Sequence, residues 1–476
     1  MTQIASQSKD FPQWYLDVVE KAEMAQHSKV KGCMVIRPYG YAIWELVQQE
    51  LDRRIKAAGV KNAYFPLFIP QSFLTKEKDH VKGFAPECAV VTHGGGKELA
   101  EPLVIRPTSE TIMYDTYSDW IHSYRDLPLL INQWANVVRW EMRTRPFLRT
   151  TEFLWQEGHT VHATKAEAET EVARALKMYE DFDREFLALP VLTGTKSPKE
   201  TFAGADYTRT TEALAKDGKV IQAGTSHLLG QTFAKAFDIK FQDEKGEMQY
   251  AWQTSWGLST RIIGTIIVCH GDEKGLVLPP RVAPYQVVLV PIYKTDEEKA
   301  AVFEALEKVE ASLKDAGVRT ELDKRDTVSP GYKFNEWELK GVPLRLELGP
   351  RDLLKNSCMV ARRDTGEKFS LALADVAKEI PASLEFIQSE MLKRAEAHLQ
   401  ENIREAESIE EMVKILDEKG GLVKAAWAGT EEDEKKIQDQ TKATIRIVSE
   451  EKWPSERACV LTGEKTTTMV YFARAY

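Results

Sequence analysis

Residues 137–159 constrain the fold of this chain more than any other stretch: VVRWEMRTRPFLRTTEFLWQEGH. Both outer parts are rich in Val, Phe and Trp, as strands are, and a basic loop joins them. Because side chains alternate along a strand, Arg139 and Glu141 are expected on one face of the first strand. On the second strand, four side chains are expected to share a face: Phe153, Trp155, Glu157 and His159. The stretch predicts an antiparallel pair that presents Arg, Glu, aromatic and His side chains under a basic loop.

The residue composition and the pattern of expected strands and helices change twice along this chain of 476 residues. We therefore expect three domains: 1–284, 285–382 and 383–476. The first mixes aromatic, strand-like segments with helices and ends in GLVLPPRVAPY, whose prolines indicate a linker. The second alternates strands with an amphipathic helix, AAVFEALEKVEASLKDAG, and predicts a compact α/β domain. The third begins with a long charged helix and ends in a small mixed module.

Charge and cysteine placement exclude several classes of protein. The formal net charge of −9 argues against indiscriminate nucleic-acid binding but leaves room for a local basic surface. The five cysteines are scattered without a CxxC pair, so neither a disulfide framework nor a zinc ribbon is expected. The first residues, MTQIASQSKDFPQW, contain no apolar h-region, and no apolar run of about 18 residues occurs, so we expect a cytoplasmic protein without membrane contact.

Two further stretches bear on the chemistry. HGGGKE at residues 93–98 lacks the spacing of a phosphate-binding loop and predicts a glycine-rich hairpin turn. In SWGLSTRIIGTIIVCHGD, residues 255–272, a strand containing Gly257 delivers Arg261 at the head of an apolar, helix-like run. A buried arginine needs an anion to offset its lost hydration, so this segment predicts an anion beside Arg261.

Several motifs resemble those of class II aminoacyl-tRNA synthetases, and most closely those of prolyl-tRNA synthetases of the archaeal and eukaryotic-like type. Residues 59–66 resemble motif 1, RWE at 139–141 with its loop resembles motif 2, and GLSTR at 257–261 resembles motif 3. RPTSE, FAGADY and QAGTSHLLGQ resemble stretches specific to the prolyl enzymes. GYKFNEWELKGVPLRLELGPRD resembles their anticodon-binding domain, and FARAY, which ends in Tyr476, resembles their C-terminal end. The resemblance spans nearly the whole chain.

The resemblance implies an α+β fold with an antiparallel-sheet catalytic domain, an α/β anticodon-binding domain and a small α/β C-terminal module, assembled as a homodimer. It also implies that L-proline and ATP form prolyl-adenylate, and that the prolyl group then passes to the 3′ end of tRNA(Pro). Mg²⁺ is expected to bridge the ATP phosphates. Because the attacking carboxylate is already an anion, catalysis is expected to depend on positioning and charge stabilisation.

Roles for individual residues follow from the same resemblance. Arg139 and Arg261 are the expected catalytic groups, since Arg139 would clamp the α-phosphate and Arg261 would approach the γ-phosphate. The residues expected to contact proline are Thr108, Glu110, Arg139, His227, Trp155 and Phe202. The residues expected to contact ATP are Arg139, Glu141, Arg149, Thr150, Gln222, Thr225, Ser259 and Arg261. Contacts with tRNA are expected from Lys333, Glu336, Lys340 and Arg345, with Phe334 and Trp337 as stacking platforms.

The chain departs from the family pattern in the C-terminal module, where several relatives carry a four-cysteine zinc site. Only Cys459 remains here, with Ala428 and Asp433 upstream and Thr462 at the partner position. One thiolate cannot complete a tetrahedral site, so this degenerate module is expected to fold without structural zinc. The span between motifs 2 and 3 also leaves no room for the editing insertion of bacterial-type enzymes, so no editing in cis is expected.

Two other interpretations remain open from sequence. The chain could be a synthetase-like protein that binds tRNA without catalysis, although Arg139, Glu141 and Arg261 together favour an active enzyme. It could also adenylate an amino acid for another carrier, but such an enzyme would have no use for the region 285–382.

Overall fold

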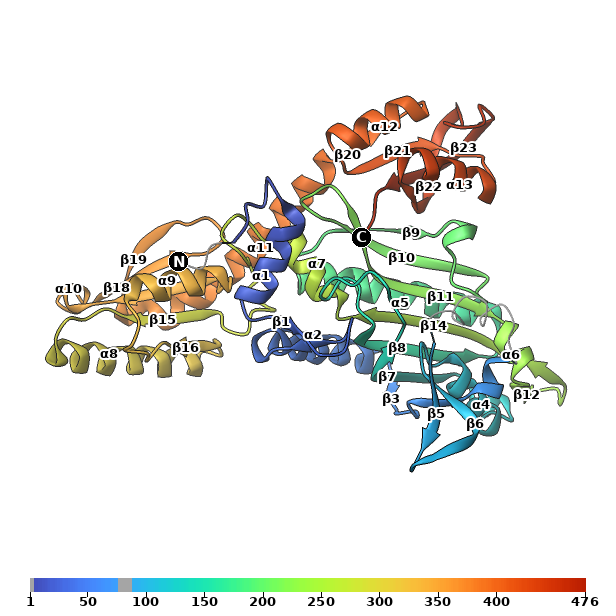
Figure 1. Ribbon diagram of the computed structural model, residues 1–476, viewed down its shortest axis with the longest axis horizontal. Coiled ribbons are helices and arrows are strands. Elements are labelled where there is room, and N and C mark those ends of the chain that lie inside the picture. The colour runs from blue at the N-terminus through green and yellow to red at the C-terminus, as the bar shows by residue number, and fades with distance from the viewer. Residues whose placement is uncertain (1–3, 76–87) are drawn as a thin grey trace.

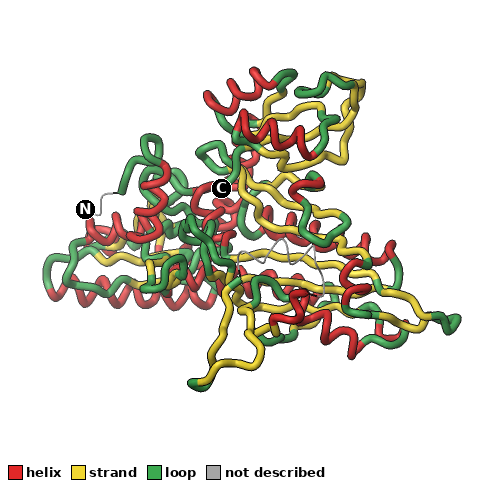
Figure 2. Tube along the Cα trace, turned by 45° about the vertical axis from the view of Figure 1, so that its right-hand side comes forward, coloured by secondary structure: helices red, strands yellow, loops and turns green. Residues whose placement is uncertain are grey.

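The computed structural model describes residues 4–75 and 88–476. The chain forms a large N-terminal body of strands and helices, an elongated α/β domain on one side of it and a small module above it (Figure 1). The same division is visible after rotation, with long strands running through the large body (Figure 2). Among the described residues, every helix is too short or too polar to span a bilayer.

An antiparallel sheet is the centre of the large body. Its strands lie in the order β9, β10, β11, β14, β8 and β7, and the short strand β3 joins the β7 edge in parallel. The strands have these bounds: β3 (Lys61–Asn62), β7 (Leu129–Val138), β8 (Glu152–His162), β9 (Val191–Thr195), β10 (Tyr207–Leu214), β11 (Val220–Gly230) and β14 (Trp252–Ser259). The predicted antiparallel pair around the basic loop is therefore confirmed as β7 and β8.

Helices bury their apolar sides together with residues of this sheet in the largest core cluster. Tyr179 and Phe182 of α5 pack there with Trp256 of β14, and the apolar run of α7 packs beside them. Among the described residues, the helices of this body are α1 (Phe11–Lys21), α2 (Pro38–Ala57), α4 (Glu110–Trp120), α5 (Lys165–Glu185), α6 (Thr232–Ala236) and α7 (Arg261–His270).

The large body also contains short antiparallel strand pairs outside the main sheet. The predicted glycine-rich hairpin is confirmed: Gly95 and Gly96 connect β5 to β6 with φ of 58° and 78°, and Gly94 pairs with Lys97. Residues 59–70 contain two short strands: Lys61–Asn62 pairs with β7, and Phe68–Pro70 pairs with β6. The remaining strands are β1 (Ala25–His27), β2 (Met34–Ile36), β4 (Phe68–Pro70), β5 (Ala89–Gly94), β6 (Lys97–Ile105), β12 (Lys240–Gln242) and β13 (Met248–Tyr250).

The second region has the predicted βαβ pattern. Its sheet has the order β16, β15, β17, β18, β19, with the first three strands parallel and the last two antiparallel. Helix α8 buries Val302, Leu306, Val309 and Leu313 against it, as the helical periodicity predicted. The elements are β15 (Val287–Pro291), α8 (Asp296–Asp315), β16 (Thr320–Leu322), α9 (Pro330–Leu339), β17 (Leu344–Leu348), α10 (Pro350–Leu353), β18 (Ser357–Arg362) and β19 (Lys368–Ala372).

Helix α11 (Val376–Glu401) connects this domain to the C-terminal module. Its first half, including Ile380 and Leu384, packs in the core of the α/β domain, whereas Leu399 packs with Leu214 and Leu422. The expected domain boundary between residues 382 and 383 thus lies inside one continuous helix.

The C-terminal module extends the main sheet. Val448 of β22 pairs with Thr195 of β9, so the strands β22, β23, β21 and β20 continue the sheet order. The module consists of β20 (Ile403–Glu405), α12 (Ile409–Glu418), β21 (Leu422–Ala426), α13 (Glu431–Thr441), β22 (Thr444–Ala458) and β23 (Lys465–Ala473).

Candidate active site

A polar cavity of about 210 Å³ lies on the face of the main sheet, between the end of β7 and the strands β8, β10, β11 and β14. Ten of the residues expected at the site line it: Thr108, Glu110, Arg139, Trp155, Phe202, Gln222, Thr225, His227, Ser259 and Arg261. Phe153, Trp155, Glu157 and His159 of β8 all line this cavity, so the predicted shared face is confirmed.

A second cavity of about 200 Å³ shares four lining residues with the first: Arg139, Phe153, Ser259 and Arg261. The remaining expected residues, Glu141, Arg149 and Thr150, line this second cavity together with Tyr476. The two cavities therefore form adjoining halves of one cleft, and every residue expected to contact proline or ATP lines one half or the other.

Arg139 lies at the junction of the two halves. The strand ends at Val138, so Arg139 and Glu141 lie in the loop beyond it and not on one strand face as expected. The exposed Trp140 and Met142 lie in the same loop. The backbone N–H of Arg139 donates to the carbonyl oxygen of Thr151 at 2.8 Å, and Nε donates to that of Pro107 at 2.9 Å. Its guanidinium lies 5.5 Å from the ring centroids of Phe153 and Trp155, which is within cation–π range.

Arg261 is the first residue of helix α7 and follows the strand that contains Ser259, so the predicted place of Arg261 at the head of an apolar helix is confirmed. The two still face the same cleft, because the backbone N–H of Arg261 donates to Ser259 Oγ at 3.2 Å. Burial, with a further contribution from the positive charge of Arg139, lowers the pKa of Arg261 to about 10. Two guanidinium groups that repel each other in a buried place favour an anionic ligand between them.

A β-bulge brings Gln222 and Thr225 to the same face of β11. Glu212 pairs with Gln222 and Thr211 pairs with Gly224, which leaves Ala223 as the extra residue. On a regular strand, the side chains of residues three apart point to opposite faces. The extra residue of the bulge shifts the alternation by one, so that Gln222 and Thr225 point to the same face. Both side chains consequently line the cleft.

Two buried ionisable residues of β8, Glu157 and His159, line the first half of the cleft. Glu157 accepts hydrogen bonds from Ser109 and, at 2.9 Å, from Gln133, and its Oε2 lies 3.0 Å from His159 Nε2. Burial alone would raise the pKa of Glu157, but its hydrogen bond to His159 and the histidine charge outweigh burial and lower it. Burial alone would lower the pKa of His159, but the hydrogen bond to Glu157 and the nearby carboxylate charges raise it. The pair is therefore held in its charged form.

His227 forms the opposite wall with Phe202. The ring centroids of the two residues are 4.7 Å apart, and His227 Nδ1 lies 2.8 Å from Thr208 Oγ1. Burial, together with the charges of His159 and Arg139, lowers the pKa of His227 to about 3. A neutral imidazole therefore lines this half of the cleft. On the other side, the hydroxyl of Thr108 donates to the carboxylate of Glu110, the first residue of α4.

Hydrogen bonds between charged residues stabilise the loop between β7 and β8, which lies beside the second half of the cleft. Glu141 accepts hydrogen bonds from the side chain of Arg149 and, at 2.9 Å, from the backbone N–H of Arg143. Burial alone would raise the pKa of Glu141, but these hydrogen bonds and the Arg149 charge lower it. Tyr476 donates to Asp217 Oδ2 at 2.7 Å, and the Arg145 guanidinium lies 5.5 Å from its ring.

Sequence reasoning missed several lining residues. Glu200 and Thr208 contribute to the first half of the cleft, and Phe147 and Leu148 to the second. The strand alternation could have found Thr208, because it lies opposite His227 on β10. No sequence periodicity identifies Glu200, which lies in the short turn η4 (Pro198–Glu200).

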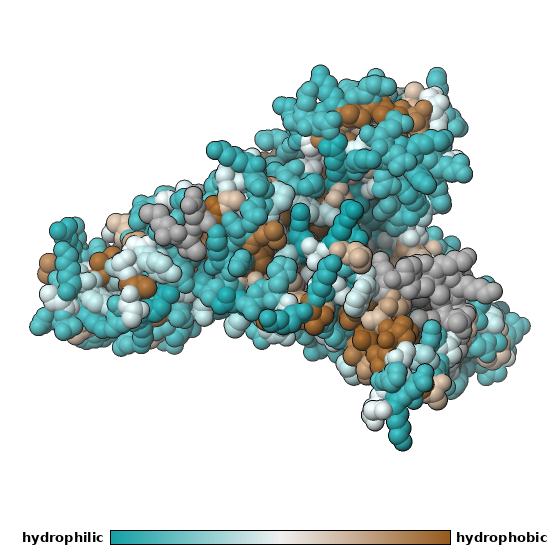
Figure 3. Space-filling view, in the orientation of Figure 1, coloured by the Kyte–Doolittle hydropathy of each residue, from teal (hydrophilic) through white to brown (hydrophobic). Residues whose placement is uncertain are grey.

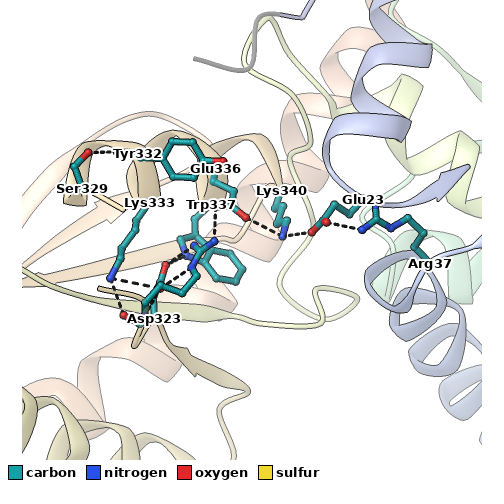
Figure 4. A network of polar contacts seen from close by, with 10 residues as sticks. Glu23, Arg37, Asp323, Ser329, Tyr332, Lys333, Glu336, Trp337 and Lys340 are labelled. Atoms are coloured by element: carbon teal, nitrogen blue, oxygen red, sulfur yellow. Dashed lines mark hydrogen bonds and ion pairs between the residues drawn. The ribbon is translucent and has the colours of Figure 1, made fainter. Parts of the chain in front are cut away.

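The structure corrects most of the expectations for tRNA contact (Figure 4). Lys333 is buried, and its Nζ donates to the carbonyl oxygen of Asp323 at 2.9 Å. Trp337 is buried and donates to Asp323 Oδ2, so it is not a stacking platform. Lys340 is also buried and bonds Glu23 of the large body and Glu336.

Arg345 remains a candidate for tRNA contact. It is half-buried, pairs with Glu347 at 2.8 Å, and lies 4.3 Å from the ring of Phe334. Glu336 also accepts from Arg325 at 2.8 Å, so its carboxylate is already held by two cations.

The C-terminal module has one thiol, Cys459, at the place where the resemblance implied a degenerate zinc site. Cys459 is buried, and burial alone would raise its pKa, but hydrogen bonds with Thr462 and with backbone groups of Ala428 and Leu461 lower it. Within residues 4–75 and 88–476, no three His, Cys, Asp or Glu side chains gather in a way that could hold a metal ion.

Comparisons with known proteins agree with this geometry. The model of the class II tRNA synthetase core domain (G, H, P, S and T) matches residues 91–270, that of an anticodon-binding domain matches 286–383, and that of the prolyl-tRNA synthetase C-terminal domain matches 409–476. The proline–tRNA ligase of Chlorobium phaeovibrioides is 53% identical over 99% of both chains. That of Natranaerobius thermophilus is 53% identical over 100% of this chain and 98% of its own.

A solved structure has the same fold. The crystal structure of prolyl-tRNA synthetase from Cryptosporidium parvum, complexed with halofuginone and AMPPNP, has a TM-score of 0.95 and 44% identity over the full length of both chains. The antiparallel sheet and its arginine-lined cleft thus define a class II aminoacyl-tRNA synthetase that uses ATP. Within that class, the chain belongs to the proline–tRNA ligase family, and its activity is the ligation of proline to tRNA.

Proposed function

We propose that Arg139 and Arg261 are the catalytic residues of proline activation. The observation that carries this proposal is their convergence on the junction of the two cavities, where burial and mutual repulsion lower the pKa of Arg261 to about 10. An α-phosphate at this junction would bring proline carboxylate and ATP together and would neutralise the repulsion. Since the nucleophile is an anion, preorganised positive charge is the main catalytic contribution that the protein has to supply.

Proline would occupy the half of the cleft between Thr108, Glu110, Trp155, Phe202 and His227. A carboxylate at Glu110 suits the secondary ammonium of proline, and the aromatic rings suit its apolar ring. The neutral form of His227 avoids repulsion between this residue and the ammonium.

ATP would extend from the junction into the other half of the cleft. Gln222, Thr225 and Ser259 line the first half near its boundary, and Glu141, Arg149 and Thr150 line the second. Mg²⁺ would be held mainly by phosphates and water, where it would neutralise phosphate charge. The residues present fit this arrangement, because Glu141 offers a carboxylate beside the second half of the cleft.

We propose further that the enzyme acts on tRNA(Pro) in the cytoplasm as a homodimer with the three domains 1–284, 285–382 and 383–476. A dimer is supported by exposed apolar side chains on contiguous elements of the large body: Tyr64, Phe68, Val90 and Trp120. Figure 3 shows hydrophobic side chains gathered above the projecting hairpin of β5 and β6. Exposed apolar side chains that gather in this way are typical of protein interfaces. Sedimentation velocity would show whether the protein is a dimer in solution.

Editing in cis is not part of the proposal. The chain between β8 and β14 forms α5, β9, β10, β11, α6, β12 and β13, most of which are built into the catalytic fold. An apolar pocket rejects a ligand that lacks one methylene by only about 1–3 kcal/mol, so some alanine or cysteine activation is expected. Incubation with Ala-tRNA(Pro) should show no hydrolysis above the uncatalysed rate; efficient deacylation would contradict the proposal.

The decisive experiment is proline-dependent ATP–pyrophosphate exchange without tRNA, compared with alanine and cysteine. Exchange with proline that disappears in Arg139→Ala would support the proposed activation chemistry. Exchange that survives in folded Arg139→Ala would overturn the assigned role.

A further inference from the structure

We propose that the hairpin of β1 and β2 is a positioning element for the activation step. In this proposal it ties the α/β domain, through Lys340 and Glu23, to the loop segment that holds Arg139. The inference rests on the role proposed above for Arg139, and it assigns a positioning function to residues outside the cleft.

An ion-pair bridge fixes the base of the hairpin to the α/β domain (Figure 4). Lys340 follows the last residue of α9, and its Nζ lies 2.7 Å from Glu23 Oε2. The other oxygen of Glu23 accepts from Arg37 Nη2 at 2.6 Å. The hydrogen bond from Lys340, together with the Lys340 and Arg37 charges, outweighs burial and lowers the pKa of Glu23. The phenol of Tyr39 also donates to the carbonyl oxygen of Lys340 at 2.8 Å.

The base of the hairpin is closely packed. Glu23 and Arg37 flank the two strands, and the backbone N–H of Arg37 donates to the carbonyl oxygen of Met24 at 3.0 Å. A Cβ atom on Gly40, in the first turn of α2, would lie 2.3 Å from that same oxygen. The backbone of α2 is therefore in close contact with the base of the hairpin at Gly40.

The tip of the hairpin reaches the loop that holds Arg139. The carbonyl oxygen of Gly32 accepts from the backbone N–H of Thr151 at 2.9 Å, and the carbonyl oxygen of Thr151 accepts from the N–H of Arg139 at 2.8 Å. Gly32 has φ of +81°, and a Cβ atom there would lie 2.1 Å from Thr151 Oγ1. Only glycine fits this position without displacing Thr151.

These contacts form a continuous connection from Lys340 to Arg139. Because hydrogen bonds and ion pairs join each step, a shift of α9 relative to the large body would be transmitted to Thr151. Energetic coupling along this connection makes perturbations at its two ends non-additive.

Helix α9 also provides a matched control. Glu338, two residues before Lys340, bonds Lys274 of the large body at 2.8 Å. This ion pair bridges the same two domains, and within residues 4–75 and 88–476 neither side chain forms a hydrogen bond or ion pair with the hairpin.

The test is a double-mutant cycle between Lys340→Met and Gly32→Ala, measured as proline-dependent ATP–pyrophosphate exchange. Exchange is measured without tRNA, so a lost tRNA contact cannot account for the result. Each single variant should lower kcat about 10-fold, since small displacements of a positioning group cost up to about 100-fold, while KM for proline changes by less than about 2-fold. The double variant should lose no more than the single variants, and Lys340→Arg should recover most of the activity.

Glu338→Gln should exchange at close to the wild-type rate, with circular dichroism showing that all variants are folded. Multiplied losses, about 100-fold in the double variant, would overturn the inference, because they would show independent effects at the two ends. An equal loss in Glu338→Gln would also overturn it, in favour of general domain docking. If the wild type lacks exchange, or if Arg139→Ala retains it, the proposed function fails instead, so the two failures are distinguishable.

Discussion

Lys333 is a buried partner of Asp323: its Nζ lies 2.9 Å from the carbonyl oxygen of Asp323 and 3.5 Å from its carboxylate. Trp337 and Arg325 also donate to this carboxylate, at 2.9 and 2.6 Å. Burial alone would raise the pKa of Asp323, but these hydrogen bonds and the charge of Lys333 bring it to about 2. The lysine that the sequence suggested for tRNA therefore organises the interior of its own domain.

Asp323→Ala should destabilise the protein strongly, because it leaves the Lys333 ammonium buried without its counter-charge. Removing one partner of a buried pair costs about 3–5 kcal/mol. Urea unfolding at pH 7, followed by circular dichroism, would measure the loss. Asp326→Ala is the control, since Asp326 pairs with Lys299 on the surface and should contribute less than about 1 kcal/mol. Equal stability of the two variants would contradict this account.

Arg261→Ala should impair activation while leaving the fold intact. Loss of one preorganised charge-stabilising group costs about 10²–10³-fold in rate, and we expect a decrease of that order in kcat/KM for ATP. Pyrophosphate exchange at several ATP concentrations would measure it. Arg53→Ala removes an exposed arginine that pairs with Glu50 on α2 and should leave exchange unchanged. A decrease of less than about 3-fold in kcat/KM for ATP in Arg261→Ala would show that Arg261 does not stabilise the phosphate charge.

Tyr476→Ala should weaken ATP use more than Tyr476→Phe. The ring lines the same cavity as Arg149 and lies 4.8 Å from Lys219 Nζ, and the hydroxyl bonds Asp217. The phenylalanine variant keeps the ring and loses one hydrogen bond, worth about 0.5–1.5 kcal/mol. We expect KM for ATP to rise several-fold only in Tyr476→Ala. Equal kinetics in wild type and Tyr476→Ala would show that the ring does not shape the nucleotide half of the cleft.

His270 should make the fold sensitive to acid. Burial, reduced in part by a hydrogen bond to the carbonyl oxygen of Leu187, lowers its pKa to about 4. Between about pH 6.5 and 4 the unfolded chain binds a proton that the folded chain does not, so the free energy of unfolding falls as pH falls. At pH 5 this residue alone would account for about 2 kcal/mol.

Urea unfolding at pH 7 and pH 5 would test this pH dependence. His270→Gln should lose less stability on acidification than the wild type, whereas His93→Gln, in the exposed hairpin, should match the wild type. An unchanged pH dependence in His270→Gln would exclude His270 as the source. His227, which also has a lowered pKa, acts in the same direction.

Metal analysis of the purified protein should show far less than one zinc per chain. Cys459 is a single buried thiol, Ala428 and Thr462 offer no thiolate or imidazole, and zinc sites need about four ligands. Stoichiometric zinc that a chelator removes with loss of helix signal would contradict this expectation. A fully folded protein after chelation would agree with it.

Much of the fold was predictable because local periodicity survives in the folded chain. The alternation of Phe153, Trp155, Glu157 and His159 placed four side chains in one cavity, and the helical spacing of Val302 and Leu306 placed α8 on its sheet. Prediction was poorer at element ends, because the first strand stops at Val138 and leaves Arg139 and Glu141 in the loop. Strand propensity alone does not show where pairing with a neighbouring strand stops.

The sequence by itself determined the order of the elements, the motifs and the residue types that surround the cleft, because these depend on short-range periodicity and on the resemblance they carry. Only the tertiary structure decided that the bulge at Ala223 joins Gln222 to Thr225, that Lys333 is buried, and that Lys340 reaches Glu23. Lys340 and Glu23 are 317 residues apart in sequence. Whether a lysine meets water, tRNA or a buried carboxylate depends on the surfaces that pack around it, and those surfaces come from distant parts of the chain.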